Sequence, residues 1–289
     1  METRNVTSVT IVTPSFNQAR FIEQTLRSVV EQGVSAEHIV VDGGSTDGTT
    51  NILARYEARL GYWQSRPDRG QTDALNQGMA RASGDIVGWI NSDDYYLPGA
   101  LRTVIARFAK PDRPDVVYGN AVTVDESGRF MRENRHGRFS LNSTVALGMD
   151  INQQALFWRR ELNPGIFPLD VSLRFCMDLE LLVKMARRGA RFARVSGCLG
   201  AFRLHGSSKT STLEEVRQAE QARIFAALNA EEHPRYGRLR ALGARVARRI
   251  DIVRDGGLAY AVLGGRLGAS VESRRAALAA SEWAEREAA

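Results

Sequence analysis

Short apolar segments alternate with amphipathic ones over the first part of the chain, and this alternation limits the folds open to it. The runs at 9–12, 38–41 and 86–90 are rich in Val and Ile and read as buried strands. Between the first two runs, apolar residues from Phe21 to Val30 follow helical spacing until Gly33 ends the element. Strands that alternate with helices predict an α/β domain with a doubly wound, mostly parallel sheet flanked by helices.

The same alternation continues along the chain. We expect further strands at 62–63 and 116–118, and helices over 52–60, 73–82 and 98–108. Asp73 stands at the start of the second of these helices, where an aspartate side chain commonly caps the free backbone N–H groups.

Polar stretches follow three of these strands: "TPSFN" after the first, "DGGSTDG" after the second and "NSDD" after 86–90. In doubly wound folds the carboxyl ends of the strands meet at one edge of the sheet, and ligands bind there. Asp93 and Asp94 are adjacent carboxylates that repel each other, so they require a positive partner. A divalent cation that also neutralises phosphate groups is such a partner.

Two common phosphate-binding signatures are missing from the sequence. The first strand is not followed by G-x-G-x-x-G, and G-x-x-x-x-G-K-[ST] does not occur. A third chemistry is a nucleotide held by its base and ribose, with its diphosphate bound through Mn²⁺ or Mg²⁺. The carboxylates at the predicted edge favour this third chemistry.

Five stretches occur in the order and spacing of a known family: "VTIVTPSFNQARFIEQTLRSVVEQ", "IVVDGGSTDGT", "DRGQTDALNQGMARASGDIVGWINSDD", "QQALFWRR" and "MDLELLVKMARRGARF". They resemble a family 2 glycosyltransferase of the GT-A fold over roughly the first 210 residues. The resemblance implies inverting transfer of a sugar from a nucleotide-diphosphate sugar, a UDP-sugar first of all. The acceptor would be a hydroxyl of a glycan or of a lipid-linked acceptor.

The resemblance also implies roles for single residues on the donor side. Asp42 would contact the base, Asp93 the ribose and Asp94 the divalent cation, as in a DXD-type motif. His205 would lie beside the metal or the diphosphate. The nucleotide-contacting set would be Thr13, Pro14, Asp42, Asp73, Asp93 and Arg203. Many family members have aspartate where this chain has Asn91, so its acidic set is one charge smaller.

On the acceptor side, the resemblance makes Asp178 the catalytic base. An inverting transfer needs a carboxylate that removes the acceptor proton as the sugar becomes oxocarbenium-like. The family often has Glu-Asp at this helix start, whereas this chain has Met177-Asp178. Glu180 would point roughly 200° away from Asp178, because a helix turns about 100° per residue.

Several of these residues also fit ordinary structural roles. Asp42 precedes two glycines, where an aspartate often bonds its own turn. Asp93 and Asp94 fit a solvated acidic turn before a helix, and His205 fits a solvent-facing side chain.

Composition describes one large globular domain with an appendage. The chain has 289 residues, of which 43% are hydrophobic and 25% charged, and carries a net charge of +6. After about residue 207 it becomes rich in helix formers and arginine, over 213–229, 235–254 and 258–289. We therefore expect a catalytic domain over 1–210 and a helical extension over 211–289. The extension's basic, amphipathic stretch fits a packed helix with solvated arginines, peripheral attachment to an anionic membrane, or an oligomer contact.

The sequence also favours a cytoplasmic protein. Its start lacks the pattern of a signal peptide, and no apolar run reaches the roughly 18 residues of a membrane span. Cys176 and Cys198 lack metal-type spacing and are expected to be free thiols.

Two other functions compete with sugar transfer. The basic tail and a pI near 9.7 fit a nucleic-acid-binding module, but acidic residues at the predicted edge would repel a phosphate backbone, so we expect no nucleic-acid partner. A nucleotidyltransferase of related fold would carry a Gly-rich, basic loop after the first strand, and "TPSFNQAR" is a poor match.

Overall fold

A mixed sheet runs through the described part of the chain. The computed structural model describes residues 8–149, 151–229 and 237–254, and the positions 257, 260, 262, 269 and 273–277. The strands lie side by side in the order β3 (Tyr62–Ser65), β2 (Ala36–Asp42), β1 (Val9–Ser15), β4 (Ile86–Trp89), β8 (Leu156–Arg159), β6 (Val116–Val124), β9 (Phe192–Arg203), β5 (Tyr95–Tyr96). β7 (Phe130–Asn134) pairs with β6 outside this order. The helix expected over 258–289 lies largely outside the described residues.

The predicted α/β fold is confirmed, and its parallel part is the half that carries the polar stretches. β3, β2, β1 and β4 run parallel to one another. β8 then enters antiparallel to both β4 and β6, while β6 and β9 are parallel again. Ser15 pairs with Asp42, so β1 and β2 end level with each other, whereas Trp89 at the end of β4 pairs with Val12, three residues before the end of β1.

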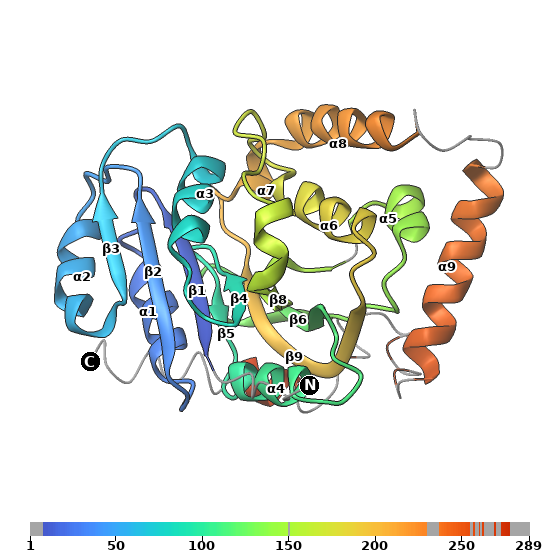
Figure 1. Cartoon of the computed structure of the whole chain (residues 1–289), viewed down its shortest axis with the longest axis horizontal. Coiled ribbons are helices and arrows are strands. Elements are labelled where there is room, and N and C mark those ends of the chain that lie inside the picture. Colours follow the sequence, from blue (N-terminus) through green and yellow to red (C-terminus); the bar gives the residue numbers. More distant parts are fainter. Residues whose placement is uncertain are drawn as a thin grey trace.

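Helices cover both faces of the sheet (Figure 1). They are α1 (Ile22–Val30), α2 (Thr49–Tyr56), α3 (Gln71–Arg81), α4 (Ala100–Phe108), α5 (Leu141–Leu147), α6 (Met177–Arg187), α7 (Lys209–Thr212), α8 (Glu214–Asn229) and α9 (Gly237–Arg254). Short 3₁₀ turns lie at Glu57–Arg59, Gln153–Ala155 and Arg160–Gly165. Within the described residues, no helix is long and apolar enough to cross a membrane.

Alternate residues of each buried strand face opposite helix layers. Val12, Val41 and Trp89 pack with the apolar faces of α3 and α6. Ile11 and Ile86 instead join the cluster that contains residues of α4. This period-two pattern explains why the strands read as continuous apolar runs, because a sheet covered on both faces needs apolar residues at every position.

Close packing of α3 on the sheet fixes the wall of the site. A Cβ atom on Gly78 would lie 2.4 Å from Val12 Cγ1, so only glycine permits this approach. The expectation that Asp73 caps α3 is wrong: the N-cap residue is Gly70, and Asp73 lies in the first turn. Its carboxylate instead accepts hydrogen bonds from the Arg69 N–H at 3.2 Å and the Arg69 guanidinium at 2.9 Å.

Candidate active site

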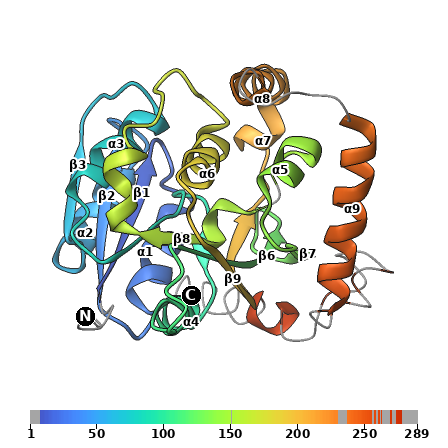
Figure 2. The same ribbon diagram turned by 45° about the vertical axis from the view of Figure 1, so that its right-hand side comes forward.

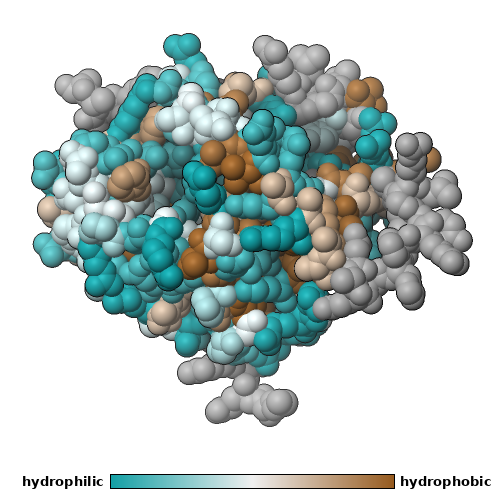
Figure 3. Space-filling model, turned by 90° about the horizontal axis from the view of Figure 1, so that it is seen from above, coloured by the Kyte–Doolittle hydropathy of each residue, from teal (hydrophilic) through white to brown (hydrophobic). Residues whose placement is uncertain are grey.

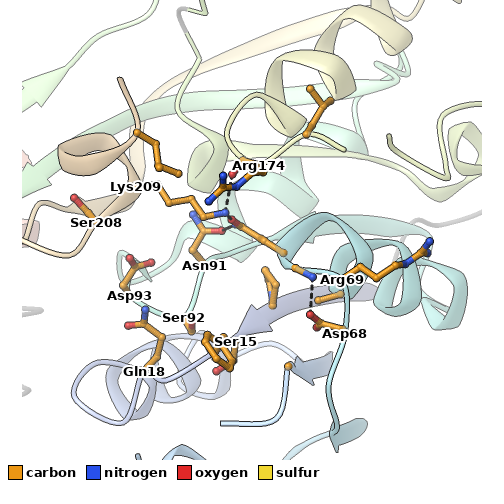
Figure 4. Close-up of a pocket in the computed structure, with 18 of the residues that line it drawn as sticks. Ser15, Gln18, Asp68, Arg69, Asn91, Ser92, Asp93, Arg174, Ser208 and Lys209 are labelled. Atoms are coloured by element: carbon orange, nitrogen blue, oxygen red, sulfur yellow. Dashed lines mark hydrogen bonds between the residues drawn. The ribbon is translucent and has the colours of Figure 1, made fainter. Parts of the chain in front are cut away.

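A cavity of about 800 Å³ opens at the carboxyl ends of β1, β2 and β4. One wall comes from the end of β1 and the segments that follow these strands: Pro14–Phe16, Gln18, Gly43 and Asn91–Asp93. Residues 68–71, at the start of α3, extend this wall. The facing wall comes from 171–174 and 207–210 (Figure 4). The three polar stretches therefore meet at one edge, as the alternation of strands and helices predicts.

The two adjacent aspartates point in different directions. Asp93 lines the cavity, whereas Asp94 is 1% exposed and lies behind the turn. Asp94 Oδ1 accepts the Arg203 N–H at 2.9 Å, and Oδ2 accepts the Asn91 amide at 3.3 Å. Burial, and secondly the neighbouring Asp93 charge, raise the pKa of Asp94 well above its usual range.

Arg203 braces this turn from behind. Its guanidinium Nε donates to Asp93 O at 2.9 Å and Nη1 to Glu126 O at 2.9 Å, while Nη2 donates to Gln24. Since the guanidinium is buried and bonded in this way, Arg203 lies outside the residues that line the cavity. The structure therefore places Arg203 as a support of the Asp93–Asp94 turn.

His205 reaches the cavity-facing aspartate. Its Nε2 lies 3.0 Å from Asp93 Oδ2, and its Nδ1 lies 2.9 Å from Ser207 Oγ. The ring also packs on Phe21, with 4.7 Å between centroids. An imidazole held from both nitrogens has a fixed orientation, so Asp93 and His205 form a rigid pair.

A cationic side chain crosses the cavity from the facing wall. Lys209 Nζ donates to Arg174 O at 2.8 Å and to Gln71 Oε1 at 2.5 Å. Gln71 in turn donates to Asn91 Oδ1 at 2.7 Å, which links Lys209 to the turn of Asp93. Burial lowers the pKa of Lys209, against the opposing effect of the Asp93 charge. In Figure 4 Arg174 and Lys209 lie side by side, opposite Asp68 and Ser15.

Asp42 and Thr13 are turned into the protein. The Asp42 carboxylate accepts from Gly44 N at 3.1 Å, Ser45 N at 2.8 Å, Ser45 Oγ at 2.6 Å and Ser65 Oγ at 2.7 Å. This is the turn role that its position before two glycines also allowed. Thr13 Oγ1 contacts His38 Nε2 at 2.9 Å, so Pro14 is the member of that pair that lines the cavity.

Asp68 and Phe16 line the cavity near these turned-in residues. The Asp68 carboxylate accepts Gly70 N at 2.7 Å and occupies space beside Gly43, where an added Cβ would lie 3.1 Å away. Burial raises the pKa of Asp68, and the charges of Asp73 and Asp42 raise it further. Phe16 is 59% exposed, so a flat apolar ring stands free at the rim.

Asp178 lies in the first turn of α6, beside the facing wall. Its Oδ1 accepts the Leu179 N–H at 2.8 Å, and burial raises the pKa of Asp178 to about 6. The positive charge of Lys209 opposes this rise and the negative charge of Glu220 adds to it. Glu180 is engaged elsewhere, accepting Asp170 N at 2.9 Å and pairing with Lys184 at 2.9 Å.

Glu220, a buried carboxylate of α8, belongs to none of the motifs singled out in the sequence. Its Oε1 accepts Arg174 N at 2.7 Å, and its Oε2 accepts Phe175 N at 3.0 Å and Cys176 N at 2.8 Å. These three N–H groups end the loop that leads into α6. Glu220 therefore connects α8 to the helix start that carries Asp178, although α8 belongs to the part of the chain expected to be an appendage.

Comparison with known proteins shows the family of the chain that forms this cavity. Residues 10–166 match the sequence model described as Glycosyl transferase family 2. The chain belongs to glycosyl transferase family 2. The matched region contains β1, β2 and β4 with the turns that follow them, and it ends before Asp178 and Glu220.

Curated relatives of this family 2 protein are also glycosyltransferases. An uncharacterized glycosyltransferase of Mycobacterium tuberculosis is 31% identical over 182 residues, 62% of this chain and 69% of the relative. A PGL/p-HBAD biosynthesis glycosyltransferase of Mycobacterium bovis is 29% identical over 179 residues, covering 60% of this chain and 68% of the relative.

Solved structures confirm the GT-A fold of this glycosyltransferase. S. aureus TarS matches with a TM-score of 0.60 at 19% identity, covering 88% of this chain but 46% of TarS. TarS 1–349 in complex with UDP has a TM-score of 0.55 at 18% identity, over 97% and 92% of the two chains. The mannosyltransferase PcManGT of Pyrobaculum calidifontis, in complex with GDP-Man and Mn²⁺, has a TM-score of 0.56 at 18% identity, over 95% and 86%.

The side chains at the cavity wall fit a divalent cation that binds together with a nucleotide. Among the described residues, no group of three or more His, Cys, Asp and Glu side chains is placed to hold a metal. Asp93 supplies one carboxylate at the cavity wall, and His205, which is 5% exposed and does not line the cavity, contacts that carboxylate through Nε2. Mg²⁺ is commonly held by one or two carboxylates, with phosphate oxygens and water completing its shell, so the Asp93 carboxylate fits that mode of binding.

Proposed function

We propose that this glycosyltransferase moves a sugar, with inversion, from a nucleoside-diphosphate sugar to a hydroxyl of a glycan or lipid-linked glycan. The observation that carries the proposal is the pair of opposed walls. One wall presents Asp93, and Asp178, whose pKa is raised to about 6, follows four positions after Arg174 of the other wall. A UDP-sugar is the first donor candidate, supported by the TarS structures with UDP and UDP-GlcNAc, and a GDP-sugar is the second, supported by PcManGT.

The donor would lie along the wall that follows β1, β2 and β4. Phe16 and Pro14 offer apolar surface to a base, and Asp68 can accept hydrogen bonds from its N–H groups. Arg174 and Lys209 present positive charge to the diphosphate from the facing wall.

The family resemblance implies that Asp94 binds the cation and Asp93 the ribose. The burial of Asp94 favours a different assignment of these two roles. Because Asp94 is buried against the Arg203 N–H, we assign the cation to Asp93, whose carboxylate is oriented by His205 Nε2. Asp94 then holds the turn in shape. When bound, a divalent cation neutralises the diphosphate and so stabilises the leaving group.

The chemical step would begin at the acceptor hydroxyl. Its oxygen attacks the anomeric carbon of the donor as the bond from that carbon to the phosphate oxygen breaks. The hydroxyl proton passes to the carboxylate of Asp178, and the nucleoside diphosphate leaves with the bonding electrons. A base with a pKa of about 6 is ionised at neutral pH and is a stronger base than an ordinary aspartate.

We propose that the reaction takes place in the cytoplasm, where Cys176 and Cys198, both free, stay reduced. Family membership also removes the need for a nucleotidyltransferase or a nucleic-acid-binding module to explain the acidic edge.

Thermal unfolding with UDP, GDP and dTDP, each with and without Mn²⁺ or Mg²⁺, tests the donor proposal. One nucleoside diphosphate should raise the Tm in a cation-dependent way. Release of that diphosphate from a panel of its sugar conjugates would then identify the sugar without knowledge of the acceptor. A protein that is stabilised by none of them, or that hydrolyses none of their sugars, would contradict the proposal.

A further inference from the structure

The helix α9 turns an apolar stripe away from the protein. Leu242, Val246, Ile250 and Val253 are 59%, 51%, 45% and 40% exposed. These positions recur at the spacing of one helix face, because a helix turns about 100° per residue. Large apolar side chains that are all exposed along one face mark a surface for interaction.

The opposite face of α9 is the one that packs on the protein. Ile252 is 4% exposed, and Asp251 Oδ2 accepts the Arg138 N–H at 3.2 Å. Arg248 donates to Arg135 O at 3.5 Å. At 100° per residue, the mean direction of these three residues lies roughly opposite that of the stripe. The stripe is therefore not the face that anchors the helix.

Arginines border the stripe on both sides. Arg245 and Arg249 lie along one side and Arg254 along the other, and all three are exposed. The only acidic residue of α9, Asp251, turns toward the protein. The outward face is thus apolar in the middle and positively charged at its margins.

α9 stands at an edge of the described part of the chain. In two views turned by 45°, α9 stands at the outer edge of the molecule, with α5 between it and α6 (Figures 1 and 2). No described strand or other helix carrying a label lies outside it in either view.

We propose that the outward face of α9 binds the surface of an anionic lipid bilayer. The stripe would enter the boundary between headgroups and acyl chains, while Arg245, Arg249 and Arg254 meet anionic headgroups. A second copy of this chain fits the face less well, since pairing two such faces brings like charges together. Nucleic acid would satisfy the arginines but would leave the apolar stripe without a counterpart.

Flotation of the full-length protein with lipid vesicles tests the proposal. Vesicles of phosphatidylcholine with about 30% phosphatidylglycerol should bind the protein at least about tenfold more strongly than phosphatidylcholine alone, and added salt should weaken binding. The double variant Val246→Glu, Ile250→Glu should lose about tenfold or more of this binding. Arg245→Glu with Arg249→Glu should also lose it.

Matched controls test whether vesicle binding depends on this face of α9 or only on exposed apolar and basic residues in general. Met131→Glu places the same charge on another exposed apolar residue, on β7, and Arg102→Glu with Lys110→Glu removes two exposed cations near α4. Both should bind vesicles as the wild type does, and all variants should keep the Tm of the wild type.

Equal binding by the α9 variants, or no preference for anionic vesicles, would overturn the proposal. So would a dimer, measured by light scattering without lipid, that dissociates on Val246→Glu with Ile250→Glu, because the occupant would then be a second copy. Since vesicle binding needs no donor or acceptor, failure here leaves the proposed sugar transfer untouched.

Figure 3 adds the view from above, where apolar side chains show in the central part of the surface between hydrophilic margins. The apolar surface of the molecule is thus not confined to α9, which is why the vesicle test depends on paired variants rather than on binding alone.

Discussion

The Glu220 carboxylate of α8 accepts the Cys176 N–H at 2.8 Å, two positions before Asp178. The same carboxylate holds the N–H groups of Arg174 and Phe175. Without the Glu220 carboxylate, these N–H groups would lack an acceptor, and their partial positive charges would act on the start of α6. A helix from the C-terminal part of the chain thereby sets both the position and the electrostatic surroundings of the proposed base.

Replacement of Glu220 by Gln should move the pH profile. The Glu220 charge disfavours the Asp178 anion and so raises its pKa, so its removal should lower that pKa. The acid limb of kcat, expected near pH 6, should therefore shift to lower pH, and kcat itself should fall as the loop loosens. Glu214→Gln, on the same helix but exposed, is the control and should leave the limb in place. An unmoved limb in Glu220→Gln would mean that Glu220 has no electrostatic influence on the base.

Replacement of Asp178 by Asn should separate binding from chemistry. The amide keeps the shape but cannot take the acceptor proton, so kcat should fall by about 10²–10⁴-fold while nucleotide-dependent stabilisation persists. Glu180→Gln should change kcat little, because that carboxylate is bonded to Asp170 N and Lys184. A large loss in Glu180→Gln alone would transfer the role of base to Glu180.

Asp93→Asn and Asp94→Asn make the same chemical change at neighbouring positions with opposite expectations. Asp93→Asn should abolish cation-dependent stabilisation by the nucleoside diphosphate. Asp94→Asn should largely keep it, because an amide oxygen can still accept the Arg203 N–H. Asp94→Ala leaves that buried N–H without an acceptor and should cost about 1–3 kcal/mol of stability. The reverse pattern in the two Asn variants would restore the cation to Asp94.

Lys209→Gln should weaken nucleoside-diphosphate binding. The ammonium that crosses the cavity to Gln71 is lost, and a charge-assisted contact to phosphate contributes on the order of 1.5–3 kcal/mol, or about tenfold or more in Kd. Arg69→Gln removes a cation at the same cavity whose side chain is 71% exposed and paired with Asp73, and its effect should be much smaller. Calorimetric titration of both variants with the nucleotide measures the difference.

Periodicity made the fold and the location of the cavity predictable. Apolar runs such as 9–12 and 86–90 became β1 and β4, and parallel pairing then brought their polar ends together. Periodicity does not act within a turn, so it could not reveal which of Asp93 and Asp94 faces the cavity. That choice depends on the Arg203 N–H, which lies more than a hundred positions along the chain. The same reason hid Glu220, whose partners are 44 to 46 positions away.

Asp42 shows a second limit of predicting the role of a residue from its motif alone. The Asp42 carboxylate accepts hydrogen bonds from four nearby donor groups, one of which is Ser65 Oγ at the end of the adjacent strand. Asp68, from the next loop, lines the cavity in its place. A carboxylate in the expected stretch is therefore not by itself a carboxylate in the site.

The bond from α8 to the start of α6 has a consequence for how this enzyme can be recombined with its relatives. The family match ends at residue 166, which makes that position an inviting splice site for hybrids with altered acceptors. A hybrid joined at residue 166 takes α6 and Glu220 from the same parent, whereas one joined at residue 210 takes α6 from one parent and the carboxylate that holds its start from the other. The acceptor half should therefore be grafted as one block that runs through α8.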